Sequence, residues 1–429
     1  LNLEFLCLSY IITNDKRQTT MSNDLDKALL ATPANNLSVY NSQPTKAYSS
    51  ADFGADQWLV RSGANYNIKT YSKSVAPQAM STGALANGGQ LNWTLPREDK
   101  GYIERPCIKL TVNNPGVDAI AMSAVPHWIS EIEVRCGSEV LSRVTGDQLY
   151  VAQTAFDASR WEYLASLAGQ DKDFALTTLA ANSTADYYVL WPLSVFDQVT
   201  MPGYQNADIT IKCQFALSSK VKISGTGNPT LNGAELMYSI IEPMDISMLN
   251  SEISTFNNSR IADRMVALDS FTDTKAIAVS AKYDFTLNKK GMYLGGFVTC
   301  RSSTATASGL STFIDLDACR FDIQDASGQS KMGNSKTGAE LRKLMWSRFD
   351  ARDKSRLPLQ KKIYPIMFCG SLETSINNVG NGFVYLEPTD KLVLITDSAV
   401  ATGTYEITFH GLTYQNVISE QGNISVLRS

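Results

Sequence analysis

The stretch HWISEIEVRCGSEVLSRVTGDQLY, residues 127–150, contains the local signals that decide the fold. Apolar and polar residues alternate over 132–135 and are followed by Gly137 and Ser138, which predicts a hairpin-like pair of antiparallel strands. Thr145 and Gln148 then match a capping box, in which a Thr is followed three residues later by Gln or Glu. The stretch therefore predicts a strand pair that leads directly into a helix.

Two helices are predicted in the chain, each with one apolar face lying on a β body. The first spans residues 147–168 and the second residues 338–350. The apolar positions recur at helical spacings and are Leu149, Ala152, Phe156, Tyr163 and Leu167 in the first helix and Leu341, Leu344, Met345 and Phe349 in the second.

The second helix begins with the same device as the first, because Thr337 and Glu340 repeat the capping box of Thr145 and Gln148. The two Thr residues, at 145 and 337, are 192 positions apart, close to half of the chain. Around each helix the same order is found: a strand pair upstream, then an apolar strand containing Pro, a further strand and a closing strand. These segments are 132–138, 191–193, 208–216 and 235–241 in the first half, and 321–328, 364–366, 391–396 and 404–412 in the second. We therefore predict two similar β-sandwich domains that are split near Asp245.

Strand signals dominate the rest of the chain. Ile108, Leu110 and Val112 alternate with Lys109 and Thr111, and residues 209–215 and 405–410 show the same period of two. This alternation places one set of side chains in a core and the other toward solvent or a partner, which is typical of antiparallel sheets. The fold class predicted from the residues is all-β.

The composition is that of a folded protein with little charge. The 429 residues are 44% hydrophobic and 19% charged, which excludes a disordered chain. No run of about 18 uncharged apolar residues occurs, which excludes a polytopic membrane protein. The 38 Lys and Arg residues against 42 Asp and Glu give a net charge of -4, which argues against a free-standing nucleic-acid binder.

The sequence offers little for catalysis or for metal binding. It has only 2 His and lacks the short motifs of hydrolases, zinc proteases and nucleotide-binding proteins. We interpret His127 as a packed or hydrogen-bonded residue and place His410 on the polar side of a strand. The 7 cysteines are scattered without a CxxC pair, Cys213 reads as a buried apolar residue, and folding in a reducing compartment is expected. No catalytic, cofactor-binding or metal-binding residue is predicted.

Two further segments each allow two interpretations. Residues 1–20 precede the first Met, Met21, and read either as translated upstream sequence or as an apolar arm that contacts a membrane or a neighbour. The basic run at 342–362 reads either as the solvated face of the second helix with a loop, or as a patch that contacts an acidic partner.

The residues around the first helix resemble a known family. The run from His127 to Val134, then Cys136-Gly137-Ser138, the capping box and residues 189–196 (VLWPLSVF) are similar to the first half of the double jelly-roll major capsid proteins of icosahedral DNA viruses of the PRD1 and adenovirus lineage. Ser138 stands where a second glycine is common in that family, and residues 194–196 replace its more usual aromatic ending. The second half is similar in the order of its elements rather than in its letters.

The resemblance implies two tandem jelly-roll sandwiches, each with a short inserted helix, at residues 51–244 and 245–429 after an N-terminal arm at 1–50. It also implies a homotrimer with a pseudo-hexagonal base that tiles an icosahedral shell, with loops at 302–311, 328–336 and 350–362 as candidates for towers and lateral contacts. The expected location is the virion, assembled inside the host cell. The expected partners are neighbouring copies, minor capsid or vertex proteins and an internal membrane contacted through the N-terminal arm, without sequence-specific binding of nucleic acid.

Two other functions remain open at this point. A carbohydrate-binding or receptor-binding β-sandwich, such as a lectin-like module or a viral spike, would need exposed aromatic residues, for which Trp93 and Tyr204 are the candidates. A glycosidase on a jelly-roll scaffold would need two carboxylates placed across a cleft, and a sequence cannot establish their separation. The non-enzymatic capsid role is the leading prediction.

Overall fold

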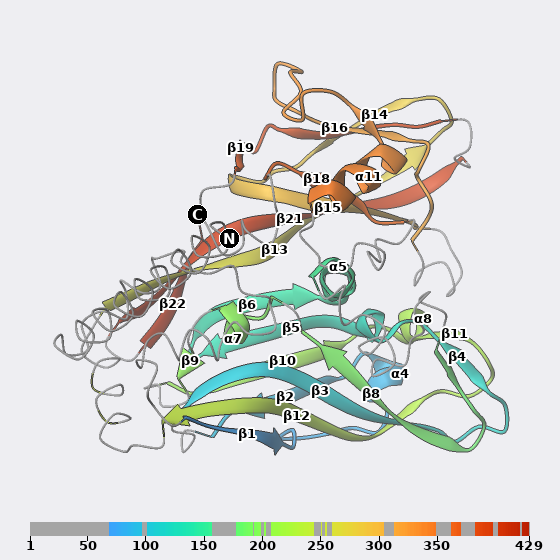
Figure 1. The fold of residues 1–429 in the computed structure, drawn as a ribbon. Coiled ribbons are helices and arrows are strands. Elements are labelled where there is room, and N and C mark those ends of the chain that lie inside the picture. The colour runs from blue at the N-terminus through green and yellow to red at the C-terminus, as the bar shows by residue number, and fades with distance from the viewer. Residues whose placement is uncertain are drawn as a thin grey trace, which may run out of the picture.

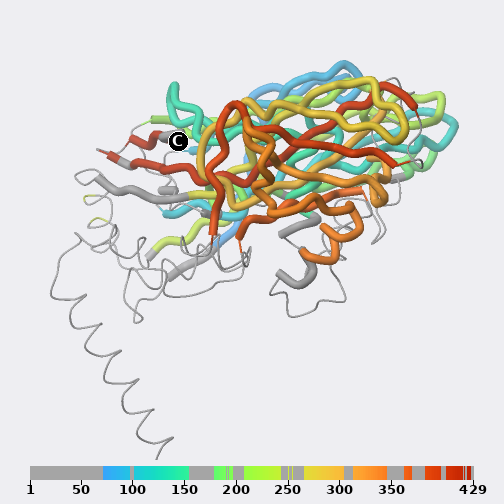
Figure 2. Tube along the Cα trace, turned by 90° about the horizontal axis from the view of Figure 1, so that it is seen from above, coloured from blue at the N-terminus to red at the C-terminus, as the bar shows by residue number. Residues whose placement is uncertain are grey.

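The computed structural model describes residues 68–96, 101–156, 177–191, 193–198, 201–202, 207–243, 250, 254, 260–303, 313–348, 362–369, 382–397, 402–420 and 423–428. Strands make up most of these residues and pair antiparallel throughout. The strands form two groups, which we call the first half (residues 68–243) and the second half (residues 260–428). The second half stacks on the first in Figure 1, and the view from above shows it (yellow to red) lying over the first half (blue to green, Figure 2).

The first half is a sandwich of two four-stranded layers, in the orders β1-β12-β3-β8 and β2-β10-β5-β6. The short β9 pairs with β3, and β11, β4 and β7 form a small sheet at one end. The strands are β1 (Ile68–Val75), β2 (Gln90–Thr94), β3 (Tyr102–Asn114), β4 (Ile120–Met122), β5 (Ile129–Cys136), β6 (Glu139–Thr145), β7 (Thr177–Leu179), β8 (Ser183–Leu190), β9 (Met201–Pro202), β10 (Ile209–Phe215), β11 (Lys222–Ser224) and β12 (Thr230–Pro243). The helices are α4 (Ala84–Asn87), the 3-10 turn η1 (Val125–Trp128), α5 (Gly146–Phe156), α7 (Val195–Gln198) and α8 (Ser218–Val221).

The second half repeats this topology. Its layers run β13-β21-β15-β18 and β14-β20-β16-β17, so each of these eight strands has a counterpart at the same place in the first half, whereas β22, which pairs with β21, has none among the described residues. Even the short β19 pairs with β15 as β9 pairs with β3. The elements are β13 (Arg260–Ile277), β14 (Lys282–Thr286), β15 (Gly291–Ser302), β16 (Arg320–Gln324), β17 (Lys336–Thr337), α11 (Gly338–Arg348), β18 (Tyr364–Met367), β19 (Val384–Leu386), β20 (Lys391–Ile395), β21 (Gly403–Glu420) and β22 (Asn423–Arg428). The predicted duplication of an all-β design is therefore confirmed at the level of strand order.

The period-two segments form strands where the sequence predicts them. Residues 209–215 are β10, whose burial alternates along the strand, and the alternating segments at 108–112 and 405–410 lie within β3 and β21. The second half has an apolar core between its two layers, built by residues such as Phe285 and Phe321. The core of the first half, which includes Trp93 and Phe215, is joined by three residues of the second half, Met265, Val417 and Ile424. Burial of this apolar surface is the main term that stabilises each sandwich.

Three sequence predictions need correction or stay open. At the described positions 191 and 193 the predicted strand is not found, because β8 ends at Leu190 and Leu193 lies in a turn with a φ of 57°. In the second half the corresponding Pro365 does lie in a strand, β18, which pairs with β15 and stands at the end of the sheet order among the described residues, a position where Pro is tolerated. The predicted helix at 147–168 is described only as far as Phe156, and the boundary predicted near Asp245 lies outside the described residues and stays a prediction.

Candidate functional site: the interface between the halves

Helix α5 lies between the two halves, and its first turn is fixed by the sequence Thr145-Gly146-Asp147-Gln148 (Figure 1). The capping box forms as predicted: Gln148 Oε1 accepts the N–H of Thr145 at 2.7 Å, and Thr145 Oγ1 accepts the N–H of Gln148 at 3.3 Å. Gly146 has no room for a Cβ, which would overlap the carbonyl oxygens of Pro126 and Ile129. The helix therefore begins in direct contact with the turn that carries His127.

The second half repeats this helix start. Thr337 and Glu340 form the same capping box, at 2.8 Å and 3.2 Å, and a Cβ on Gly338 would overlap the ring of Tyr364 and the carbonyl oxygen of Leu316. The helix α11 buries Leu341 but leaves Leu344 42% exposed, which corrects the predicted apolar face. The side chains of Met345 and Phe349, the other two residues of that predicted face, lie outside the described residues.

Gln148 differs from Glu340 by having an amide group, and that group joins the halves. Its Nε2 donates to the carbonyl oxygen of Leu268 at 2.9 Å and to Oγ of Ser270 at 2.7 Å, both on β13 of the second half. A Glu carboxylate has no proton to donate at neutral pH, so Gln at this position both caps α5 and binds the other half.

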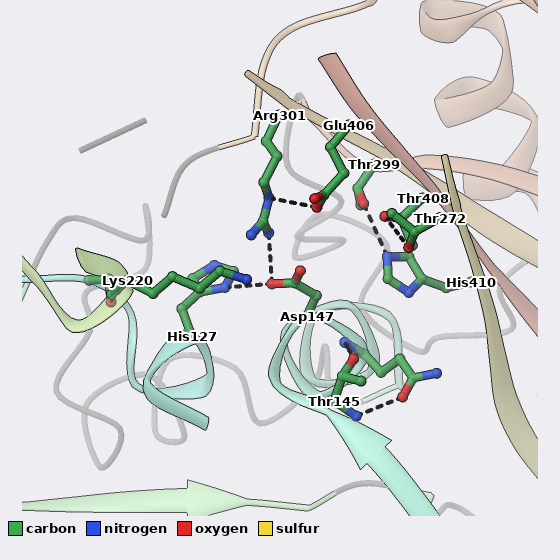
Figure 3. Close-up of polar contacts among 12 residues, drawn as sticks. His127, Thr145, Asp147, Lys220, Thr272, Thr299, Arg301, Glu406, Thr408 and His410 are labelled. Carbon is green, nitrogen blue, oxygen red and sulfur yellow. Dashed lines mark hydrogen bonds and ion pairs between the residues drawn. The ribbon is translucent and has the colours of Figure 1, made fainter. Parts of the chain in front are cut away.

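Asp147 is the central charge of the interface (Figure 3). Its Oδ1 lies 2.9 Å from Nδ1 of His127, in its own half, and 2.7 Å from Nη2 of Arg301 on β15 of the second half. Burial acts to raise the pKa of Asp147, but the Arg301 guanidinium and the His127 hydrogen bond outweigh it, so the pKa lies well below its usual value. Asp147 is therefore an anion at neutral pH.

Arg301 is almost completely buried, with 3% of its side chain exposed. Its Nε lies 3.9 Å from Oε1 of Glu406, and its guanidinium carbon lies 5.1 Å from the centre of the Phe313 ring. Nη1 of Arg301 has no hydrogen-bond partner among the described residues. A buried cation of this kind depends on Asp147, its nearest anion.

His127 packs between aromatic rings as well as against Asp147. Its ring stacks on Tyr150 with centroids 4.6 Å apart and meets the edge of Phe313 at 5.6 Å. Burial lowers the pKa of His127, the Asp147 hydrogen bond opposes this, and the positive charges of Arg301 and Lys220 lower it further.

His410 lies at the same interface, between two hydroxyl groups on neighbouring strands, of which Figure 3 shows that of Thr299. Its Nδ1 is 2.9 Å from Oγ of Ser270 on β13, and its Nε2 is 3.0 Å from Oγ1 of Thr299 on β15. Burial lowers the pKa of His410 to about 4. The ring is therefore neutral at pH 7.

An apolar cluster surrounds this polar network and buries residues of both halves together. We call it the interface cluster, and it consists of Ala124, Tyr150, Val151, Val266, Leu294, Phe297, Phe313, Ile363, Cys369, Leu412 and Tyr414. A groove with a volume of about 310 Å³ opens beside it between β6 and β13, with Arg143, Asp269 and Lys290 among its lining residues. The described residues contain no group of three or more His, Cys, Asp or Glu side chains placed to hold a metal ion.

The predictions for single residues have mixed outcomes. His127 is packed and hydrogen-bonded as predicted, and Cys213 is buried as predicted. His410 lies on the polar side of β21 as predicted, beside the hydroxyl groups of Ser270 and Thr299. It is only 1% exposed, because the first half covers that side of the strand. Trp93, a candidate for an exposed aromatic, is fully buried in the first core, and Tyr204 lies outside the described residues.

The structure describes only part of the predicted loops and of the basic run. Within 328–336, Lys331 packs back onto the sheet and donates to Asp390 at 2.6 Å, while 304–311 and 350–361 lie outside the described residues, as do 1–20. From the basic run, Arg342 pairs with Asp317 of its own half. Three residues of this interface were not identified from the sequence, His410, Arg301 and Gln148. The one sequence signal for the interface is that residue 148 is Gln, whereas the capping box of the second helix has Glu.

Comparison with known proteins supports the fold. No protein-family model matches the sequence, and no curated protein matches it. Solved structures do match: VP54 of PBCV-1, in a crystal structure fitted into a cryo-EM reconstruction of the virophage Sputnik, is 11% identical with a TM-score of 0.63 over 85% of this chain and 97% of that chain. The Faustovirus major capsid protein gives 8% identity and a TM-score of 0.54 over 82% and 90% of the two chains. The major capsid protein of Sulfolobus turreted icosahedral virus gives 14% and 0.50 over 81% and 96%. With its two repeated sandwiches, the chain has the double jelly-roll fold of viral major capsid proteins.

Proposed function

We propose that this chain is the major structural subunit of an icosahedral virus capsid, and that three copies form a trimer with a pseudo-hexagonal outline. The observation that carries the proposal is the pair of jelly rolls joined in one chain, an arrangement similar to capsid proteins of PBCV-1, Faustovirus and Sulfolobus turreted icosahedral virus over more than four fifths of the sequence.

The duplicated fold supplies a physical reason for a ring. Within the chain, the α5 side of the first half packs on the β13-β21-β15 sheet of the second half. The second half has its own helix, α11, at the place of α5, and the first half has its own sheet, β1-β12-β3, at the place of β13-β21-β15. The two complementary surfaces therefore recur at the opposite ends of one chain. A second copy can pair them in a head-to-tail contact, and three chains close a ring when each junction turns by about 60°.

The chemistry of α11 indicates what this contact between chains requires. The positions of α5 that face the second half, Asp147, Tyr150 and Val151, correspond to Ala339, Arg342 and Lys343 in α11, since both helices have 11 residues and begin at their Gly. The counterpart sheet of the first half exposes Ser72, Ser74 and Glu235. A contact between subunits through these surfaces is more polar than the interface within the chain.

The proposal places the chain in the virion shell, next to other copies of itself and to minor capsid or vertex proteins. It assigns no catalytic step to the chain. The net charge of -4 supports a shell whose genome is neutralised by other components. Among the described residues, no helix is long and apolar enough to cross a membrane. Contact with an internal membrane through residues 1–50 is a prediction about residues outside those described.

Electron microscopy of the purified full chain tests the proposal. The expected image is a particle with three-fold symmetry and a hexagonal outline. A homogeneous monomer that binds glycans would instead favour the carbohydrate-binding alternative, which has lost Trp93 as an exposed aromatic.

A further inference from the structure

Both histidines of the chain lie at the interface between the halves. The sequence has 2 His, and His127 on η1 and His410 on β21 are 4% and 1% exposed. Groups that change charge between pH 5 and pH 7 are thus placed where the halves meet.

His127 is held where a second positive charge is unfavourable. The ring lies near Asp147 on α5, Arg301 on β15 and Lys220 on α8 (Figure 3). It also stacks on Tyr150 of α5. Asp147 already pairs with Arg301 at 2.7 Å. A protonated His127 would share Asp147 with Arg301 and would add to the positive charge of Lys220, in a region from which water is largely excluded.

His410 is held in a hydrogen-bond chain that fits a neutral ring. Gln148 Nε2 can only donate, so Ser270 Oγ accepts from it at 2.7 Å and is able to donate its own proton to Nδ1 of His410 at 2.9 Å. Nε2–H of His410 then donates to Thr299 Oγ1 at 3.0 Å. Protonation would turn Nδ1 into a donor that competes with Gln148 for Ser270.

The charges around His410 offer little compensation. Arg301 and Asp147 are the charged groups that act on its ring, with opposite effects, and the neighbouring strands β13 and β15 present only the hydroxyl groups of Ser270 and Thr299 to it. Burial lowers the pKa of both histidines, in agreement with this geometry.

We propose that the two histidines make the interface between the jelly rolls sensitive to protons: both rings are neutral while the halves are packed together, and acidification to about pH 5 opens the interface while each jelly roll stays folded. The position that corresponds to Asp147 in α11 is Ala339, so this device belongs to the interface within the chain and does not recur in the contact proposed between chains. The inference concerns a single chain and does not rest on the capsid role.

The cysteines provide a built-in probe. Cys369 belongs to the interface cluster and is 1% exposed, whereas Cys213 and Cys319 lie in the first and second cores. Labelling of the full chain with 4,4′-dithiodipyridine, a disulfide reagent that reacts in acid, followed by mass spectrometry of peptides, measures the opening of each region. Rates at each pH are divided by those of the urea-unfolded chain, which removes the intrinsic pH dependence of the thiols.

The normalised labelling rate of Cys369 should rise at least about twenty-fold from pH 7 to pH 5. This is the increase in the open population that follows when one histidine, with a pKa near 6.5 in the open form, binds a proton only there. Labelling of Cys213 and Cys319 should stay flat over the same range. In the double variant His127→Asn, His410→Asn the rise at Cys369 should disappear. If that variant does not fold, each single variant should show a smaller rise than the unmodified chain.

Three results would overturn the proposal. They are a Cys369 rate that does not change with pH, a rise at Cys213 and Cys319 that parallels the rise at Cys369, and a rise that persists unchanged in the histidine variants.

Discussion

Asp147 of the first half and Arg301 of the second half form an ion pair with Oδ1 and Nη2 2.7 Å apart, and the same oxygen lies 2.9 Å from the ring of His127. One carboxylate oxygen thus connects the turn before β5, the helix α5 and the strand β15. Because Arg301 is almost fully buried, removing its anion leaves a charge that water cannot reach. The interface between the jelly rolls therefore depends on this pair more than on an ordinary surface contact.

Replacing Asp147 should destabilise the chain strongly. We expect Asp147→Ala to lower the free energy of unfolding by about 3–5 kcal/mol, the usual cost of breaking a buried pair. Urea unfolding followed by fluorescence measures it. The matched control is Asp186→Ala, which removes an exposed pair with Lys109 and should cost about 1 kcal/mol or less. Equal losses for the two variants would contradict the assignment.

The two helix-start glycines should be equally intolerant of a side chain. Gly146→Ala and Gly338→Ala should each destabilise the chain by about 3 kcal/mol, because the added Cβ overlaps backbone or ring atoms that cannot move freely. Gly233→Ala is the control, since its Cβ would meet only Thr111 at an ordinary distance of 3.4 Å. Thermal unfolding compares the three, and a tolerant Gly146 would show that α5 is not held as described.

The free energy of unfolding should decrease as the pH falls below about 6.5. The pKa of His410 is about 4 in the folded chain and near 6.5 when the ring is exposed, so its contribution is complete above pH 6.5 and is lost as the pH falls from 6.5 toward 4. The loss amounts to roughly 3 kcal/mol. Asp147, whose folded pKa is depressed, adds a further loss only as the pH drops below its usual value near 3.8. Urea titrations at pH 7 and pH 5 measure the loss of free energy of unfolding that is due to His410. His410→Asn should make this loss smaller. A variant with the same pH dependence as the unmodified chain would refute the role given to His410.

Helix α11 should control association of the chain. Lys343 and Leu344 are exposed, so Lys343→Glu with Leu344→Glu should leave the subunit folded while it disrupts the proposed contact between chains. The expected result is a shift from trimer to monomer in sedimentation, while the circular dichroism spectrum shows that the subunit is still folded. Val117→Glu, at a residue that is 81% exposed in the turn after β3, should keep the trimer. If the variant with both α11 substitutions remained a trimer, α11 would be excluded as the contact surface between chains.

The strands and helix starts were predictable because their signals are local. The alternation at 209–215 matches β10, and the capping boxes at 145–148 and 337–340 form hydrogen bond for hydrogen bond. The duplication followed from the order of these local signals along the chain, which the two matching sheet orders reproduce.

The interface was not predictable in the same way, because it joins segments that are distant in sequence. His410 alternates with apolar neighbours as a solvent-facing residue would, and only the packing of the first half against β21 buries it. Leu344 shows the reverse: its helical spacing predicts burial beside Leu341, but Leu341 is 3% exposed and Leu344 is 42% exposed. Periodicity identifies two faces of an element, and tertiary packing decides what covers each face.

The most direct test of the central claim, that this double jelly roll is a capsid subunit which assembles in threes, is the native mass of the purified full chain. We predict a dominant species at three times the chain mass of 47.0 kDa. A single species at 47.0 kDa across the accessible concentration range would contradict the claim.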